Sequence, residues 1–130
     1  LEPAVFVLRL VPGMRADIIP LLAPHYRALV LESFGVGGLP GGEHGEMFAA
    51  LRRWCESGRL AVFTTQVPHE GCDLAVYEVG RAVGELPGVL EARDMTPEAV
   101  AVKLMWALGQ TEDREKAARL FETPIEYDIM

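Results

Sequence analysis

Short apolar runs that alternate with helix-like segments constrain the fold of this chain more than any other feature of its sequence. Four of these runs are rich in aliphatic and β-branched residues, the composition typical of buried strands. They span Ala4–Leu10, Arg27–Phe34, Arg59–Thr65 and Gly88–Ala92. Because each run is continuously apolar, it predicts a strand covered on both faces, as in a parallel sheet. The sequence therefore predicts a three-layer α/β/α domain with a roughly four-stranded parallel sheet.

Helical segments are expected between and after the strands. They span Ala16–Leu22, His44–Ser57, Leu74–Val83, Pro97–Leu108 and Thr111 to about Phe121. The fourth has Thr96 as its N-cap and Pro97 at its first helical position. Its sequence is apolar nearly all round, which predicts a largely buried helix. The predicted domain is Rossmann-like, and in such sheets ligands bind beyond the carboxyl ends of the strands.

Length, charge and cysteine content narrow the class of protein. The 130 residues fit one domain, 1–130, with a core of its own. The formal net charge of −7 argues against a nucleic-acid partner, which requires a basic face. Cys55 and Cys72 form no Cys-x-x-Cys pair and indicate a reducing compartment, the cytoplasm.

The N-terminal segment is apolar, but Arg9 and Pro12 interrupt it early. We therefore expect neither a signal peptide nor a membrane span there. The first residue is Leu1 rather than methionine, and we expect Glu2 and Pro3 to be the end of a linker from a preceding domain.

Two loops at predicted strand ends carry the candidate binding residues. Gly35, Gly37 and Gly38 form neither a Gly-x-Gly-x-x-Gly motif nor a phosphate loop with its lysine, so their spacing leaves open a structural turn or a ligand loop. Thr65 and Gln66, together with Thr64, offer hydroxyl and amide groups that either orient a small polar ligand or cap the next loop. Catalysis by Ser33 or by Thr65 would need a nearby base.

Metal and ion-pair candidates are few. His25 and His44 are scattered, and the metal-like spacing of His69 and Cys72 is a single pair, so we expect no metal and no cofactor. Lys103 is the one charge beyond the first turn of its apolar helix, and a buried lysine requires a partner. Asp94 lies just before that helix, which predicts a structural ion pair if Lys103 folds back, with a catalytic lysine as the alternative.

Five blocks taken together resemble a known family. They read "FVLRLVPGM", "ALVLESFGVGGLP", "LAVFTTQVPHEG", "YEVG" and "DMTPEAVAVKLMWAL". In order and spacing this chain, from about Val5 to Leu108, resembles the C-terminal domain of bacterial cytoplasmic-type (type I-like) L-asparaginases. The strand with its Pro-Gly pair, the "GVG" turn, the Thr-Gln pair and the "DMT" block are jointly specific, although none is so alone.

The resemblance implies a two-domain amidohydrolase that converts L-asparagine and water to L-aspartate and ammonia, as a homodimer or homotetramer. It implies that the nucleophilic threonine lies on an N-terminal domain absent from this chain. These 130 residues would then hold no catalytic residue, would be inactive alone, and would support the active site and subunit interface. The substrate- or effector-binding residues carried over are Ser33, Gly35, Gly37, Gly38, Thr65 and Gln66.

Three positions depart from the family pattern. Gly38 stands where the family has an asparagine whose side chain reaches toward the active site. Glu32 and Val67 stand where members with an allosteric site have arginine and cysteine. A carboxylate repels the substrate carboxylate that an arginine would hold, so we expect asparagine-dependent allostery to be lost.

Two alternatives stay open at this point. One is the asparaginase-like subunit of a tRNA-dependent amidotransferase, although this acidic chain shows no basic surface for RNA. The other is a non-enzymatic binding or assembly module of the same fold, which the residues Glu32, Gly38 and Val67 favour.

Overall fold

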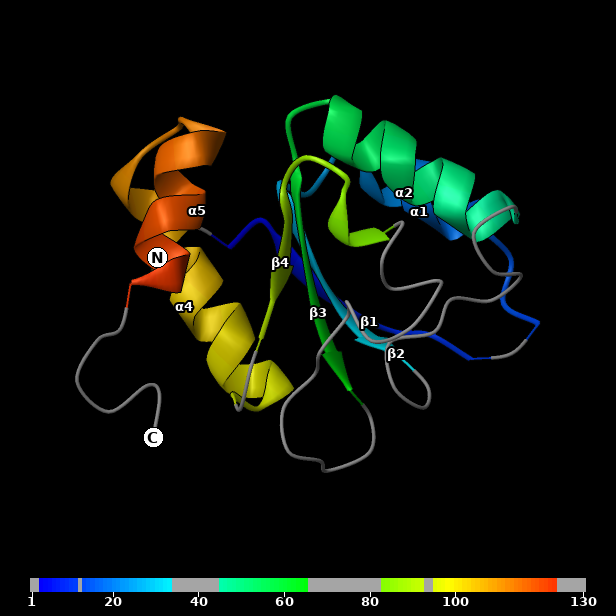
Figure 1. Cartoon of the computed structure of the whole chain (residues 1–130), viewed down its shortest axis with the longest axis horizontal. Coiled ribbons are helices and arrows are strands. Elements are labelled where there is room, and N and C mark those ends of the chain that lie inside the picture. The colour runs from blue at the N-terminus through cyan, green and yellow to red at the C-terminus, as the bar shows by residue number, and fades with distance from the viewer. Residues whose placement is uncertain (1–2, 12, 34–44, 66–82, 93–94, 124–130) are drawn as a thin grey trace.

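The computed structural model describes residues 3–11, 13–33, 45–65, 83–92 and 95–123 (Figure 1). Its elements, in chain order, are β1 (Val5–Arg9), α1 (Ile18–Leu22), β2 (Ala28–Ser33), α2 (Glu46–Glu56), β3 (Leu60–Thr65), β4 (Val89–Glu91), α4 (Pro97–Gln110) and α5 (Arg114–Glu122). The four strands form one parallel sheet in the order β1-β2-β3-β4. The predicted parallel α/β architecture is confirmed, and each predicted strand is found within one or two residues of its bounds.

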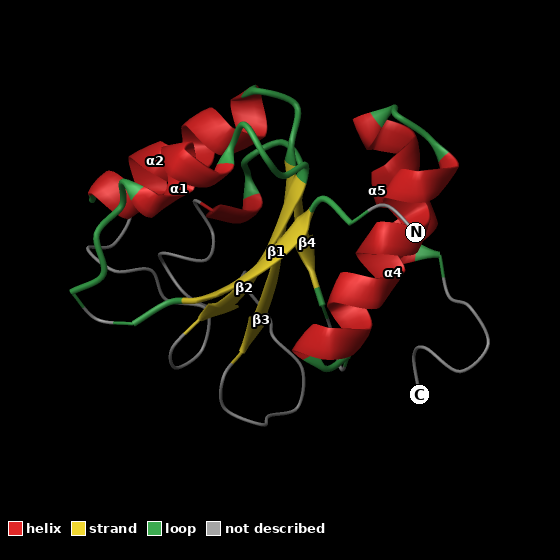
Figure 2. Ribbon diagram, turned by 180° about the vertical axis from the view of Figure 1, so that it is seen from behind, coloured by secondary structure: helices red, strands yellow, loops and turns green. Residues whose placement is uncertain are grey.

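Successive residues of the central strands face opposite sides of the sheet, and each side has its own core. Leu29 and Leu31 of β2 pack into the cluster that contains the buried residues of α1 and α2. Ala28 and Val30 pack into the cluster formed with α4 and α5. Figure 2 shows the same division, with α1 and α2 on one side of the sheet and α4 and α5 on the other. Both faces of β2 are thus covered, which explains why its sequence is continuously apolar.

Helix α2 has an amphipathic sequence, and its apolar stripe faces the sheet. Met47, Ala50, Leu51, Trp54 and Cys55 are buried at the spacing of one helical face. The helix ends before a glycine, Gly58, with a φ of +91°, a left-handed conformation that glycine adopts at helix ends. The predicted helix His44–Ser57 is confirmed over its described part.

Helix α4 begins as predicted, and its N-cap is visible. The Thr96 hydroxyl accepts a hydrogen bond from the Ala99 amide at 3.1 Å. The helix continues to Gln110, two residues beyond the predicted end. The expected burial is found on its inner face, where six residues from Val100 to Leu108 are buried, whereas Val102 on the outer face keeps 55% of its surface exposed. Two apolar layers, the sheet and α5, cover only part of this helix.

Helix α5 starts at Arg114, later than the predicted Thr111. The Asp113 carboxylate caps it, accepting from the backbone N–H groups of Glu115 and Lys116 at 2.8 and 3.2 Å. The Thr111 hydroxyl instead accepts from the Asp113 amide before the helix begins. Two good capping residues two positions apart cannot be ranked from sequence, and the carboxylate satisfies more of the free amides.

The remaining predictions concern two helices and the possibility of a membrane span. Helix α1 is shorter than the predicted Ala16–Leu22, and the predicted helix Leu74–Val83 lies, apart from Val83, outside the described residues. Among the residues that the structure describes, no helix is long and apolar enough to cross a membrane.

Candidate functional site

The carboxyl ends of β2 and β3 bring two predicted binding residues together. In the parallel register, Ser33 pairs with Thr65 at the last position of both strands. The two residues come from segments far apart in the chain, and only the register makes them neighbours. Gly35, Gly37, Gly38 and Gln66 follow these strand ends in sequence but lie outside the described residues. The edge beyond Ser33 and Thr65 is the place where ligands of parallel α/β sheets bind.

A row of polar residues lies one position earlier at the same edge. Arg9, Glu32 and Thr64 are register partners on β1, β2 and β3. An Arg9 Nη2–Glu32 Oε2 ion pair of 3.4 Å joins two of them. The Glu32 side chain is 14% exposed, and the Arg9 side chain is 66% exposed. Solvent therefore screens the ion pair mainly from the arginine side. Thr64 is buried.

This row lies on the side of the sheet that α4 covers. Val30 and Val62, two residues earlier on β2 and β3, belong to the α4 cluster, and side chains two apart on a strand share a face. From the sequence alone, Glu32 is a single substitution, and its partner Arg9 is not apparent. The end of the apolar run in β1 could have placed Arg9 at this edge of the sheet, but only the register shows that it lies beside Glu32.

Lys103 is buried, as its place in an apolar helix predicts, with 5% of its surface exposed. Its Nζ donates a hydrogen bond to the Thr123 carbonyl oxygen at 2.8 Å and lies 5.6 Å from the centroid of the Phe121 ring. Both contacts join α4 to α5. Asp94 lies outside the described residues, so its pairing with Lys103 stays a prediction. The described contacts of Lys103 are those of a structural residue.

The comparison with protein families decides the affiliation of this domain. The model of the glutaminase/asparaginase C-terminal domain matches residues 4–121. The chain belongs to this family. The predicted resemblance to the L-asparaginase C-terminal domain is thereby confirmed at the level of the family.

Similar proteins fall into two groups. An L-asparaginase of Thermococcus kodakarensis is 39% identical over 129 residues, which are 99% of this chain and 38% of that protein. A glutamyl-tRNA(Gln) amidotransferase subunit of Metallosphaera sedula is 37% identical over 123 residues, 94% of this chain and 27% of that protein. This glutaminase/asparaginase C-terminal domain therefore spans well under half the length of either relative.

Solved structures agree with the sequence comparison. The thermostable L-asparaginase of Thermococcus kodakarensis has a TM-score of 0.88 at 38% identity, over 100% of this chain and 39% of that one. L-asparaginase I of Vibrio cholerae O1 biovar eltor strain N16961 has a TM-score of 0.85 at 27% identity, over 100% of this chain and 38% of that one.

The opposite, amino edge of the sheet in this C-terminal domain is held by arginines that the sequence analysis did not single out. Arg27 donates to the carbonyls of Leu108 and Thr111, Arg59 to those of Ala23 and Tyr26, and Arg114 to those of Cys55 and Arg59. Most of these carbonyls lie at or just after helix C-termini, where the backbone has no intrahelical partner and carries partial negative charge. These contacts tie distant segments of the chain together at the amino edge.

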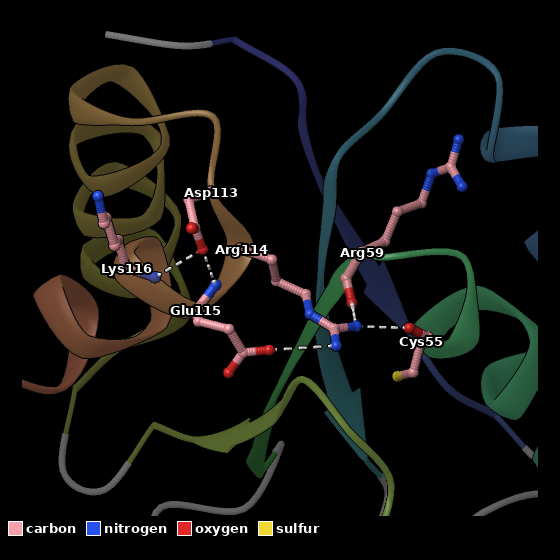
Figure 3. Close-up of polar contacts among 6 residues, drawn as sticks. All are labelled: Cys55, Arg59, Asp113, Arg114, Glu115 and Lys116. Carbon is pink, nitrogen blue, oxygen red and sulfur yellow. Dashed lines mark hydrogen bonds and ion pairs between the residues drawn. The ribbon is translucent and has the colours of Figure 1, made fainter.

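Cys55 lies beneath this arginine network at the end of α2 (Figure 3). It is a free, fully buried thiol. Burial raises the pKa of Cys55 from 9.0 to about 11, against an opposing effect of the nearby Arg114 charge. A thiol with this pKa is protonated at neutral pH and is a poor nucleophile. Within the described part of the chain, no three His, Cys, Asp or Glu side chains are grouped to hold a metal ion.

Proposed function

We propose that this chain is the C-terminal domain of a bacterial cytoplasmic-type L-asparaginase, whose complete form hydrolyses L-asparagine to L-aspartate and ammonia. The observation that carries the proposal is the likeness of the whole domain to L-asparaginases, with 39% identity and a TM-score of 0.88. The complete protein works in the cytoplasm without a metal or cofactor.

In the proposed enzyme, catalysis and support of the active site belong to different domains. The one cysteine that the structure describes, Cys55, is buried and protonated at neutral pH, so its thiol is no activated nucleophile. The chain matches only 38% of the L-asparaginase of Thermococcus kodakarensis, which leaves room for another domain in the complete protein. In this proposal the nucleophilic threonine, which the resemblance to L-asparaginases implies, belongs to a separate N-terminal domain. This domain contributes binding loops and part of a homodimer or homotetramer interface.

The binding residues that we assign to this domain are Ser33, Gly35, Gly37, Gly38, Thr65 and Gln66. The Ser33–Thr65 register supports the assignment, because it gathers two hydroxyl residues at the carboxyl edge. At the same edge stands the Glu32 carboxylate, paired with Arg9 at 3.4 Å, where a carboxylate cannot hold the carboxylate of a free amino acid as an arginine would. Asparagine therefore does not act as an allosteric effector on this domain.

Ammonia release tests the division of labour. The complete polypeptide that contains this chain is expected to release ammonia from L-asparagine, and the purified 130-residue chain is expected to release none. Activity of the chain alone would refute the separation of catalytic and supporting domains. Absence of activity in the complete polypeptide would refute the L-asparaginase function.

A pair of threonine variants tests the binding edge in the complete polypeptide. Thr65→Ala is expected to raise KM for asparagine about tenfold, the value of one lost hydrogen bond to a charged group. Thr123→Ala removes the same kind of side chain at the C-cap of α5, outside the predicted binding residues, and is expected to leave KM unchanged. Equal KM values for both variants would remove Thr65 from the site.

The amidotransferase function is the second candidate, because the amidotransferase relative of Metallosphaera sedula is nearly as similar. It predicts ammonia release that increases when glutamyl-tRNA(Gln) and the other components of the amidotransferase are added. The net charge of −7 weighs against it, since RNA contact requires basic surface. A non-enzymatic module would instead show no ammonia release under either condition and no rise in melting temperature with millimolar asparagine or aspartate.

A further inference from the structure

Strand β1 contributes none of the assigned binding residues, yet its carboxyl end is attached to β2 at the residue just before Ser33. The Leu10 N–H donates a hydrogen bond to the Glu32 carbonyl oxygen at 2.8 Å. Arg9 Nη2 lies 3.4 Å from Glu32 Oε2. The backbone and the side chain of Glu32 therefore both hold the end of β1. In the register of β2 and β3, the pair that follows Glu32 is Ser33 and Thr65.

The Arg9–Glu32 ion pair joins two strands, and water reaches its two members unequally. The Arg15–Asp17 pair, by contrast, joins residues two positions apart and leaves more than half of each side chain exposed. The Glu32 side chain is mostly covered, whereas the Arg9 side chain lies mostly in solvent. Attraction between opposite charges is stronger where water is excluded. The carboxylate therefore gains more from the guanidinium than the guanidinium, which keeps most of its hydration, gains in return.

We propose that Arg9 is a positioning residue of the binding edge: through Glu32 it fixes the end of β2, so that Ser33 keeps its register with Thr65. The proposal rests on the L-asparaginase function proposed above and adds a residue to it. The guanidinium offsets part of the cost of keeping the Glu32 carboxylate away from water. Without this charge, conformations in which the strand end turns toward solvent become more favourable, and the hydrogen bond from Leu10 to Glu32 opens more often.

Asparagine kinetics of the complete polypeptide that contains this chain test the positioning role. Arg9→Gln is expected to raise KM about threefold, the effect of one partly exposed ion pair, and to leave kcat unchanged because Arg9 is not a reacting group. Glu32→Gln is expected to change KM much less, since it removes the mostly covered charge and leaves the solvated one. The double variant is expected to match Glu32→Gln. A double variant as impaired as Arg9→Gln would mean that Arg9 acts independently of Glu32, and would overturn the inference.

Arg53→Gln is the matched control. It removes the same charge from an exposed arginine in the last turn of α2, the helix that leads to the start of β3 at the amino edge. It is expected to leave KM unchanged, and circular dichroism melts show whether each variant is folded. An equal rise in KM for Arg53→Gln and Arg9→Gln would mean that the kinetics respond only to net charge, which would also overturn the inference.

Hydrogen exchange of the Leu10 amide provides a measurement that needs no activity. In the complete polypeptide, Arg9→Gln is expected to speed this exchange about threefold, and the double variant with Glu32→Gln is expected to restore the native rate. A native rate in Arg9→Gln, or faster exchange with an unchanged KM, would contradict the proposed role. If the native polypeptide releases no ammonia, the L-asparaginase function fails, whereas the exchange rates still show whether Arg9 fixes this end of the sheet.

Discussion

At the scale of single residues, contacts with distant segments of the chain explain why residue 88 is a glycine. Its φ is +82°, and a Cβ placed there would lie 2.8 Å from the Arg59 carbonyl oxygen and 3.2 Å from Arg114 Nη1. In the sequence Gly88 is simply the first residue of a predicted strand. The structure shows that it leaves room for the Arg114 guanidinium beside the start of β4.

Gly88→Ala is expected to cost more stability than Gly58→Ala. Gly58 has a similar φ of +91° but open space around its Cα, so alanine there costs only the left-handed conformation, about 1 kcal/mol. At Gly88 the clash with backbone adds about 1–2 kcal/mol. Urea unfolding of both variants measures the difference, and equal losses would mean that the backbone moves to accept the methyl group.

Cys55 predicts a specific pH dependence of stability. Its pKa is raised to about 11 in the folded chain, so between pH 9 and that value the unfolded chain releases a proton that the folded chain keeps. Stability therefore falls as pH rises through this window and is unaffected by Cys55 below it. Between about pH 8 and 10.5 the native chain should lose roughly 2 kcal/mol more unfolding free energy than Cys55→Ala. Parallel curves for the two proteins would contradict the raised pKa.

At the scale of elements, α5 is fixed at both of its ends. At its start the Arg114 guanidinium donates to the Cys55 carbonyl at the end of α2, on the other side of the sheet (Figure 3). At its other end the Thr123 carbonyl accepts from Lys103 of α4. The amphipathic sequence predicts the helix itself, but these two attachments set its place on the sheet.

Arg114→Ala is expected to destabilise the fold by about 2 kcal/mol, because it leaves the partly buried Cys55 carbonyl without a charged donor. Lys116→Ala, in the same turn, removes an exposed cation whose described hydrogen bond is through its backbone N–H, and should cost about 0.5 kcal/mol or less. Chemical denaturation of both variants provides the measurement. A loss for Arg114→Ala no larger than that for Lys116→Ala would show that water replaces the guanidinium.

At the scale of the whole molecule, the two edges of the sheet have different tasks. Arg27, Arg59 and Arg114 tie chain segments together at the amino edge, and Ser33 and Thr65 meet at the carboxyl edge. The stabilising arginine contacts and the proposed binding residues thus lie at opposite edges of one sheet.

The sequence by itself determined the local structure of the described residues. Continuous apolar runs determined the strands because both faces of a parallel sheet are buried, and the spacing of Met47, Leu51 and Trp54 determined the inner face of α2. The five sequence blocks also indicated the L-asparaginase C-terminal domain, and the match of the glutaminase/asparaginase C-terminal domain over residues 4–121 confirms this family.

Only the tertiary structure decided which distant residues meet. Strand register, which no local pattern encodes, set Arg9 beside Glu32 and Ser33 beside Thr65. Helix packing decided that Arg114 reaches the Cys55 carbonyl and that Val102 stays exposed although its helix reads as buried. The physical reason is the same in each case: propensity and periodicity act over a few residues along the chain, whereas contacts between elements depend on how the whole chain packs.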